Sequence, residues 1–222
     1  MQKKEIASTF PRRNEMQNDI LDLCNINILG AWNISIINPI WLKEQFPHLF
    51  QQEKYEMSLK ISPNPTFLFN EQSIDIEYSN DKLLVSTKED SIEKVKLIKS
   101  MCLSIVEKLP HTPIFAIGHN YTYVVKNEFL IRNFFVNNTT NNLIHSLKYD
   151  RPIEERLSCS FALENSKLNI YFIKKKDNNT ISFNYHYQID LKDTIYSAIK
   201  AFENNFNHSK ELLLTLGKEN DN

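Results

Sequence analysis

Residues 181–189 read Ile-Ser-Phe-Asn-Tyr-His-Tyr-Gln-Ile, and Asp190 follows them directly. Apolar or aromatic side chains alternate with polar ones, and a period of two residues is typical of a strand with one buried face. After Asp190 the apolar residues recur at helical spacing as far as Leu213, so the sequence predicts a helix with Asp190 as its cap. The end of the chain is therefore predicted to be a sheet strand covered by a helix.

Upstream of this unit, the same reasoning predicts a series of strands and short helices. A long strand is expected at 113–125, and Asn127 is expected to cap a short helix. An alternating stretch at 157–163 and a stretch of strong β composition at 168–173 precede residue 181. The first half of the chain shows a similar order. Its predicted elements are a strand at 32–37, a helix that begins at Asn38-Pro39, strands at 55–61, 67–69, 74–78 and 83–87, and a helix from Asp90 to Leu109.

This order predicts an α+β fold made of two pseudo-repeated β-α-β(3–4)-α units. Each unit would have an antiparallel sheet with a long helix packed on it, and the sheets would join either edge to edge or face to face. The predicted organisation is an N-terminal arm with a short helix (1–28), a first half (29–110), a second half (111–215) and a polar tail (216–222). Gly30 and Gly118 precede similar short pieces of the two halves. The alternative is that an ordinary α+β chain divides into two similar-looking halves by chance.

Composition excludes several classes of site. The 222 residues include only 3 glycines, which lie far apart, so no glycine-rich phosphate loop is possible. The net charge of -1 does not suit a protein that binds nucleic acid by bulk electrostatics. The 3 cysteines and 6 histidines show no metal-ligand spacing, and no cofactor or metal is expected. No signal peptide or membrane span is recognisable, so we expect a cytoplasmic protein without a membrane partner.

No residue qualifies as catalytic, but four are candidates for contact with a ligand or partner. His119 is predicted to share a strand face with Phe115, Ile117, Tyr121 and Tyr123. A histidine among aromatic residues is either a tuned acid or base or, more simply, a hydrogen-bonded core residue. On the last strand, His186 and Asn184 belong to the polar face, which is either solvated or the lining of a groove. The candidate contacts are His119, Tyr121, Asn184 and His186.

A lysine run supports a separate hypothesis of nucleic-acid contact. Lys174, Lys175 and Lys176 flank strands that carry Tyr171, Tyr185 and Tyr187. Exposed aromatic rings on a sheet can stack on bases while nearby lysines bind phosphates. The alternation, however, places Tyr185 and Tyr187 on the apolar face, and a lysine run at a hairpin end is commonly a solvated turn.

Two stretches carry a family resemblance: residues 109–114 (Leu-Pro-His-Thr-Pro-Ile) running into 118–121 (Gly-His-Asn-Tyr), and residues 190–214. In element order the chain resembles the duplicated β-α-β4-α pattern of TATA-binding-protein-like and helix-grip folds. It also looks like a sporadically distributed, uncharacterised bacterial protein family. The resemblance implies a fold and no catalytic residues.

Three functions stay open at this stage. The leading interpretation is a non-enzymatic interaction or accessory subunit of a bacterial multi-protein system, with a protein partner or a homo-oligomer expected. A role in mobile-element or antiviral defence is a hypothesis prompted by the sporadic family. The alternatives are a nucleic-acid-binding protein that uses the lysine-flanked sheet and an enzyme with a site between the halves near His119 and His186.

Overall fold

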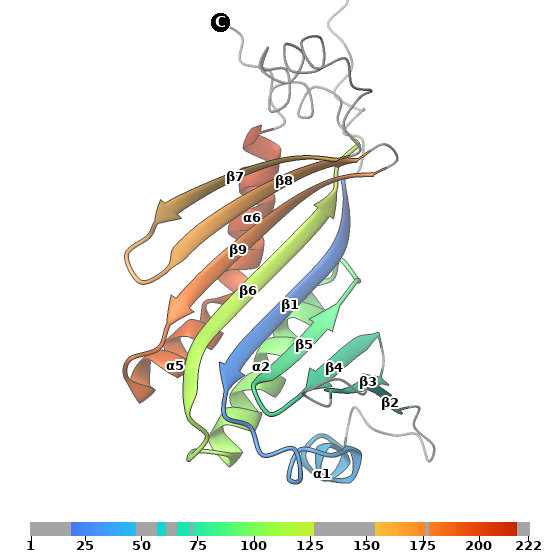
Figure 1. Ribbon diagram of the computed structural model, residues 1–222, viewed down its shortest axis with the longest axis vertical. Coiled ribbons are helices and arrows are strands. Elements are labelled where there is room, and N and C mark those ends of the chain that lie inside the picture. The colour runs from blue at the N-terminus through green and yellow to red at the C-terminus, as the bar shows by residue number, and fades with distance from the viewer. Residues whose placement is uncertain are drawn as a thin grey trace, which may run out of the picture.

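One antiparallel sheet of nine strands organises the molecule (Figure 1). The computed structural model describes residues 19–47, 57–60, 66–71, 73–126, 154–175 and 178–216. The strands follow the order β2-β3-β4-β5-β1-β6-β9-β8-β7 across the sheet. Their bounds are β1 Ile20–Gly30, β2 Met57–Lys60, β3 Thr66–Glu71, β4 Ile74–Tyr78, β5 Lys82–Thr87, β6 Ile114–Val124, β7 Glu154–Ala162, β8 Lys167–Lys175 and β9 Asn179–Gln188.

Three helices cover one face of this sheet. They are α2 (Ile92–Lys108), α5 (Lys192–Lys200) and α6 (Phe202–Leu216), and they lie behind the strands in Figure 1. A shorter helix, α1 (Pro39–Gln45), follows the turn at the end of β1. Among the described residues, no helix combines the length and the apolar composition needed to cross a bilayer. We call the opposite side of the sheet the helix-free face, because none of the described helices lies on it.

The two long central strands, β1 and β6, join the two halves of the chain edge to edge. They pair in an antiparallel way, with Cys24 opposite Tyr121 and Ile26 opposite His119. Outside β1 lie the four strands of the first half, and outside β6 lie the three described later strands. The single antiparallel sheet confirms the α+β class, and of the two arrangements expected from the sequence it corresponds to the edge-to-edge one.

The start of the sheet differs from the sequence-based prediction. The short helix expected in the N-terminal arm does not extend over residues 20–28, because β1 begins at Ile20 and crosses the proposed boundary at residue 29. The strand expected at residues 32–37 is also wrong. These residues form a turn in which the Ile36 amide donates to the Asn33 carbonyl over 3.0 Å and the Ser35 amide donates to the Asn33 side chain over 3.0 Å. The side-chain acceptor of Asn33 therefore favours a turn over a strand.

The helix caps agree with the sequence in one case and differ in two. Asn38 caps α1 as predicted, since its side chain accepts the Trp41 amide over 3.0 Å. The cap of α2 is Ser91 and not Asp90. The last helix begins after Leu191, which has no capping side chain, and it is divided into α5 and α6 at Ala201. A cap requires its acceptor at one backbone position, so an aspartate one residue early cannot serve.

Most strand predictions agree with the structure to within a few residues. Each of the predicted strands at 67–69, 74–78, 83–87, 113–125, 157–163, 168–173 and 181–189 coincides with a strand of the sheet. Only residues 57–60 of the strand expected at 55–61 are described, and they are a strand. The helix expected after Asn127 and most of the polar stretch 137–155 lie outside the described residues, as do the polar tail 217–222 and Lys176.

The core lies between the sheet and its helices, and four tyrosines bind the C-terminal helix to it. Tyr121, Tyr123, Tyr185 and Tyr187 point from β6 and β9 toward the helices. Tyr121 donates to the Phe202 carbonyl over 2.6 Å, and Tyr123 shares a hydrogen bond with Ser209 over 2.8 Å. Tyr185 bonds His208 Nδ1 over 2.8 Å, and Asn205 donates to the Tyr187 hydroxyl over 2.7 Å. Since each buried hydroxyl has a partner, the burial of these tyrosines does not incur the cost of an unpaired polar group.

Candidate functional site

A continuous row of hydrogen-bonded side chains crosses the helix-free face. Asn120 Nδ2 donates to Asn25 Oδ1 over 2.7 Å, and Asn184 Nδ2 donates to Asn120 Oδ1 over 2.6 Å. Asn169 Nδ2 donates to Asn184 Oδ1 over 2.9 Å, and Ser160 Oγ donates to Asn169 Oδ1 over 2.8 Å. We call these five residues the amide ladder, which spans β1, β6, β9, β8 and β7.

Sheet pairing positions the ladder. Each member lies directly opposite the next on the neighbouring strand, as Asn25 does with Asn120 and Asn120 with Asn184. Directly opposite side chains on one face approach within about 4.5–5.5 Å, which is the distance at which short amides can bond. Exposure increases along the row: Asn25 is buried, the three central asparagines are half-buried and Ser160 is exposed.

The ladder leaves hydrogen-bonding capacity for a ligand. Each carboxamide has two N–H donors and two acceptor lone pairs. Within the row, Asn120, Asn184 and Asn169 each use one donor and one lone pair, so each keeps one donor and one lone pair. This surface is suited to an uncharged polar partner, because amides offer donors and acceptors without a net charge.

The polar character continues beside the ladder. Thr122 and Ser182 share a hydrogen bond over 2.9 Å between β6 and β9. On the other side of the ladder, Gly118 lies opposite both Asn27 and His186. A Cβ atom at Gly118 would meet the Asn184 amide nitrogen at 3.5 Å, an ordinary contact, so there is space above this glycine. Among the described residues, the buried side-chain oxygen of Asn27 has no hydrogen-bond partner.

His119 belongs to the opposite side of the sheet, deep in the core. Its side chain is fully buried, and its ring centroid lies 5.1 Å from those of both Tyr187 and Phe202. The Asn205 amide nitrogen lies 3.0 Å from His119 Nδ1, while Nε2 has no partner among the described residues. Burial away from water lowers the pKa of His119 to about 3, so the imidazole is neutral at physiological pH. The arrangement supports the core interpretation of this histidine.

A neutral buried histidine predicts acid sensitivity. Below the unfolded-state pKa of about 6.5 the unfolded chain binds a proton that the folded chain does not, so stability falls as the pH falls from about 6.5 toward 3. We expect this residue alone to lower the free energy of unfolding by about 2 kcal/mol between pH 7.5 and pH 5. Urea denaturation at a series of pH values should show this loss, and His119→Gln should reduce it. An equal loss in the variant would contradict the assignment.

The structure separates the four candidate contact residues into two pairs. His119 and Tyr121 lie on the helix-covered face and are fully buried, whereas Asn184 and His186 lie on the helix-free face. A shared site for His119 and His186 is therefore not formed, since the sheet itself lies between them. Phe115, which was expected beside His119, is 55% exposed because an irregularity in the β1–β6 pairing lies next to it.

The described lysines of the predicted nucleic-acid site are engaged in ion pairs. Lys174 Nζ lies 2.8 Å from a Glu155 oxygen, and Lys175 Nζ lies 3.2 Å from a Glu154 oxygen. These pairs are partly exposed and contribute little to stability, but they neutralise the local charge. Tyr185 and Tyr187 are buried under the helices, as the alternation predicted. Tyr171 is 42% exposed and lies on the helix-free face, opposite Ser182 of β9.

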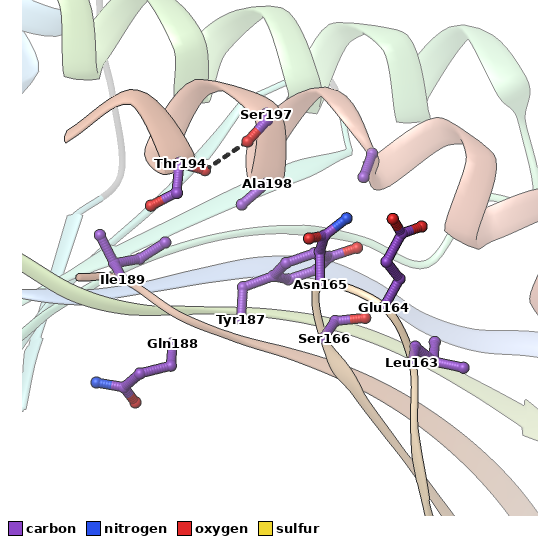
Figure 2. Close-up of a pocket in the computed structure, with 11 residues that line it drawn as sticks. Leu163, Glu164, Asn165, Ser166, Tyr187, Gln188, Ile189, Thr194, Ser197 and Ala198 are labelled. Carbon is purple, nitrogen blue, oxygen red and sulfur yellow. Dashed lines mark hydrogen bonds between the residues drawn. The ribbon is translucent and has the colours of Figure 1, made fainter. Parts of the chain in front are cut away.

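A pocket of about 440 Å³ lies on the helix-covered side (Figure 2). Figure 2 shows α5 as one wall, with Thr194, Ser197 and Ala198, and Tyr187 with the β7–β8 turn as the other. The Ser197 hydroxyl donates to the Thr194 carbonyl, the Thr194 hydroxyl donates to the carbonyl of Leu191 just before α5, and Asn205 donates to the Tyr187 hydroxyl. Glu164 is the only ionisable acid or base among the described lining residues apart from the tyrosine. This set lacks the paired groups that acid–base or nucleophilic catalysis requires.

Sequence reasoning found one ladder residue, Asn184, and missed the other four. Asn120, Asn169 and Ser160 are polar positions in predicted strands, so their strands were predicted but the residues opposite them in the sheet were not. Asn25 lies in β1, which the sequence analysis did not predict as a strand. Within the described residues, no group of three or more histidine, cysteine, aspartate or glutamate side chains could hold a metal ion.

Two comparisons with known proteins give no role for these residues. No family model matches the chain, and no curated protein matches it. The function of the helix-free face therefore has to be derived from its own chemistry.

Proposed function

We propose that this protein is a non-enzymatic binding subunit that recognises a protein partner with the helix-free face of its sheet. The observation that carries the proposal is the amide ladder, a row of half-buried carboxamides that keeps donors and acceptors available on a face without a described helix. Residues on a solvated sheet face need no such network, and polar groups that are fixed in position are typical of recognition surfaces.

Charge supports a protein partner over a polyanion. The amide ladder is uncharged, and at the start of β7 the described basic side chains Arg156, Lys174 and Lys175 are paired with Glu154 and Glu155. Phosphate binding contributes most of the affinity of nucleic-acid-binding proteins and requires an excess of positive charge. The chain as a whole carries a net charge of -1.

Gly118 offers a direct test of this surface. Gly118→Trp places a large side chain in the middle of the helix-free face, and the space above Gly118 lets the fold accept its Cβ. In the native cell, affinity purification of the tagged chain should recover a specific partner. We expect Gly118→Trp to reduce the recovered partner roughly tenfold or more, because a clash at the centre of an interface costs more than about 1.4 kcal/mol.

Two matched variants make the result specific. Gly118→Ala adds only a methyl group at the same place and should retain the partner. Leu214→Trp adds the same large ring to α6, at a side chain that is already 49% exposed, and should also retain it. Loss of the partner with Leu214→Trp but not with Gly118→Trp would place the interface on the helices and refute the proposal.

Nucleic-acid binding is the second candidate, and one observation favours it: the exposed Tyr171 ring lies on the helix-free face near Lys175. A salt-dependent shift with single-stranded or duplex probes would support this function if Tyr171→Ala together with Lys174→Ala and Lys175→Ala abolished it. Absence of binding at low salt would eliminate it.

We also infer that the two halves are copies of one β-α-β(3–4)-α unit. The sheet order supports the duplication: the first strand of each half is central, the last strand of each half is next to it, and the earlier strands follow outward. Gly30 and Gly118, which precede similar short sequences in the two halves, do not occupy equivalent positions, because Gly30 ends β1 whereas Gly118 lies within β6. Superposition of β1, β4, β5 and α2 on β6, β8, β9 and α5 in an experimental structure would test the duplication.

A further inference from the structure

We infer that two copies of this chain associate through the outer edge of β7, forming one continuous antiparallel sheet across a twofold axis at Ser160. This dimer surface is separate from the partner surface proposed above, so each can fail without the other. In Figure 1, β7 lies at the margin of the sheet, and no described strand pairs with its outer side.

The backbone groups on that outer edge are identified by the pairing with β8. The Leu163 amide donates to the Ser166 carbonyl over 2.8 Å, which makes residue 163 a hydrogen-bonded position toward β8. Such positions alternate along an antiparallel pair. The N–H and C=O groups of Arg156, Ser158, Ser160 and Ala162 therefore point away from β8, and none of the described strands pairs with them.

The edge lacks the features that usually prevent strand addition. Residues 157–163 contain no charged side chain, no proline and no glycine. Three of them are exposed apolar side chains on the helix side of the sheet: Leu157 at 37%, Phe161 at 49% and Leu163 at 39%. Edge strands that stay unpaired in native proteins commonly carry a lysine, a proline or a bulge. A long edge strand without these features favours pairing with a further strand.

The sequence of β7 is complementary to itself in one register. With Ser160 opposite its own copy, Leu157 lies opposite Leu163 and Cys159 lies opposite Phe161 of the second copy. These are the pairs without backbone hydrogen bonds, in which side chains approach most closely.

Two neighbouring registers are less favourable. A register with Cys159 opposite itself places Glu155 against Leu163, and one with Ser158 opposite itself places Glu155 against Phe161. Each would bring a carboxylate onto an apolar side chain. The chosen register provides three hydrogen-bonded pairs, which correspond to about six backbone hydrogen bonds.

Sedimentation of the full chain tests the association. We expect a species of twice the 26.2 kDa chain mass. Ser158→Pro removes an outward N–H without disturbing the β8 ladder, and it should weaken association roughly tenfold or more. Ser158→Ala, which keeps the N–H, should associate as the original chain does. If Ser158→Pro does not fold, Phe161→Lys serves as a second variant that should prevent the association. A chain that sediments as a monomer at all concentrations would overturn the proposal.

Disulfide trapping tests the register. Cys24 and Cys102 are fully buried, and burial raises the pKa of both thiols, so neither competes in oxidation. In a Cys159→Ser background, Leu157→Cys mixed with Leu163→Cys should give disulfide-linked dimers, since opposite positions of this type are close enough for a disulfide. Neither variant should cross-link with itself. Self-linkage of either variant, or no linkage in the mixture, would refute this register.

The two experiments also separate this inference from the proposed function. Gly118→Trp should leave the sedimentation of the dimer unchanged, because Gly118 lies on β6 and not on the β7 edge. Ser158→Pro should alter sedimentation whether or not the partner surface has been assigned correctly.

Discussion

Phe202→Ala will lower the free energy of unfolding by about 3–5 kcal/mol, the cost of a large aromatic side chain removed from a core. Phe202 is fully buried at the start of α6. Its ring stacks on Tyr121 at a centroid distance of 5.4 Å and contacts the His119 ring edge-on at 5.1 Å. A cavity at this position would remove a ring contact from both Tyr121 and His119.

Urea denaturation followed by circular dichroism measures this effect. Leu214→Ala is the matched control, because Leu214 lies on the same helix and its side chain is 49% exposed. The control should cost less than about 1 kcal/mol, as substitutions at exposed positions usually do. Equal costs for the two variants would show that α6 does not pack on the sheet through Phe202.

Gly30→Ala will destabilise the fold by about 3 kcal/mol through a steric clash. A Cβ atom at Gly30 would approach the Pro113 carbonyl oxygen to 2.5 Å. That oxygen cannot move freely, because it accepts the Ala31 amide over 2.9 Å, and the Gly30 amide itself donates to Asp81 over 3.0 Å. Three chain segments meet at this point, so relief of the clash would require a shift of backbone.

Gly118→Ala provides the comparison within the same sheet. Its Cβ would make ordinary contacts, the nearest at 3.5 Å to a side-chain nitrogen, and alanine is no worse than glycine in a strand. Thermal unfolding should therefore show a clear decrease in Tm for Gly30→Ala and little change for Gly118→Ala. A comparable decrease in both would mean that the loss of glycine flexibility, and not the contact with Pro113, is responsible.

The hydrophobic pattern predicts β9 well and fails at β1, for a reason visible in the sheet. In β9 every apolar residue from Ile181 to Tyr187 faces the helices without interruption. In β1 the register shifts between Leu21 and Leu23, so Leu21 and Cys24 are both buried although three positions separate them. A spacing of three residues is typical of a helix, and the irregular pairing therefore gives this strand a helical pattern.

The candidate site could be predicted only in part, because it depends on pairing between distant strands. Alternation alone places Asn184 and His186 on a polar face. It does not show that Asn120 lies opposite Asn184, or that Asn25 lies opposite Asn120. Which residues lie opposite one another is set by the registers of several strands, and these registers depend on contacts between residues far apart in the chain.

The amide ladder also has a consequence for how the strands find their alignment. A slip of two residues keeps every apolar side chain on the helix side, so burial alone penalises this error only weakly. Such a slip would separate Asn120 from both Asn25 and Asn184 and would interrupt the row on each side. In every hydrogen bond of the ladder the donor lies on the strand nearer β7 and the acceptor on the strand nearer β1. If one strand is out of register, the amide on the neighbouring strand therefore loses its partner. The complete row of hydrogen bonds therefore forms only when all five strands are in the observed register.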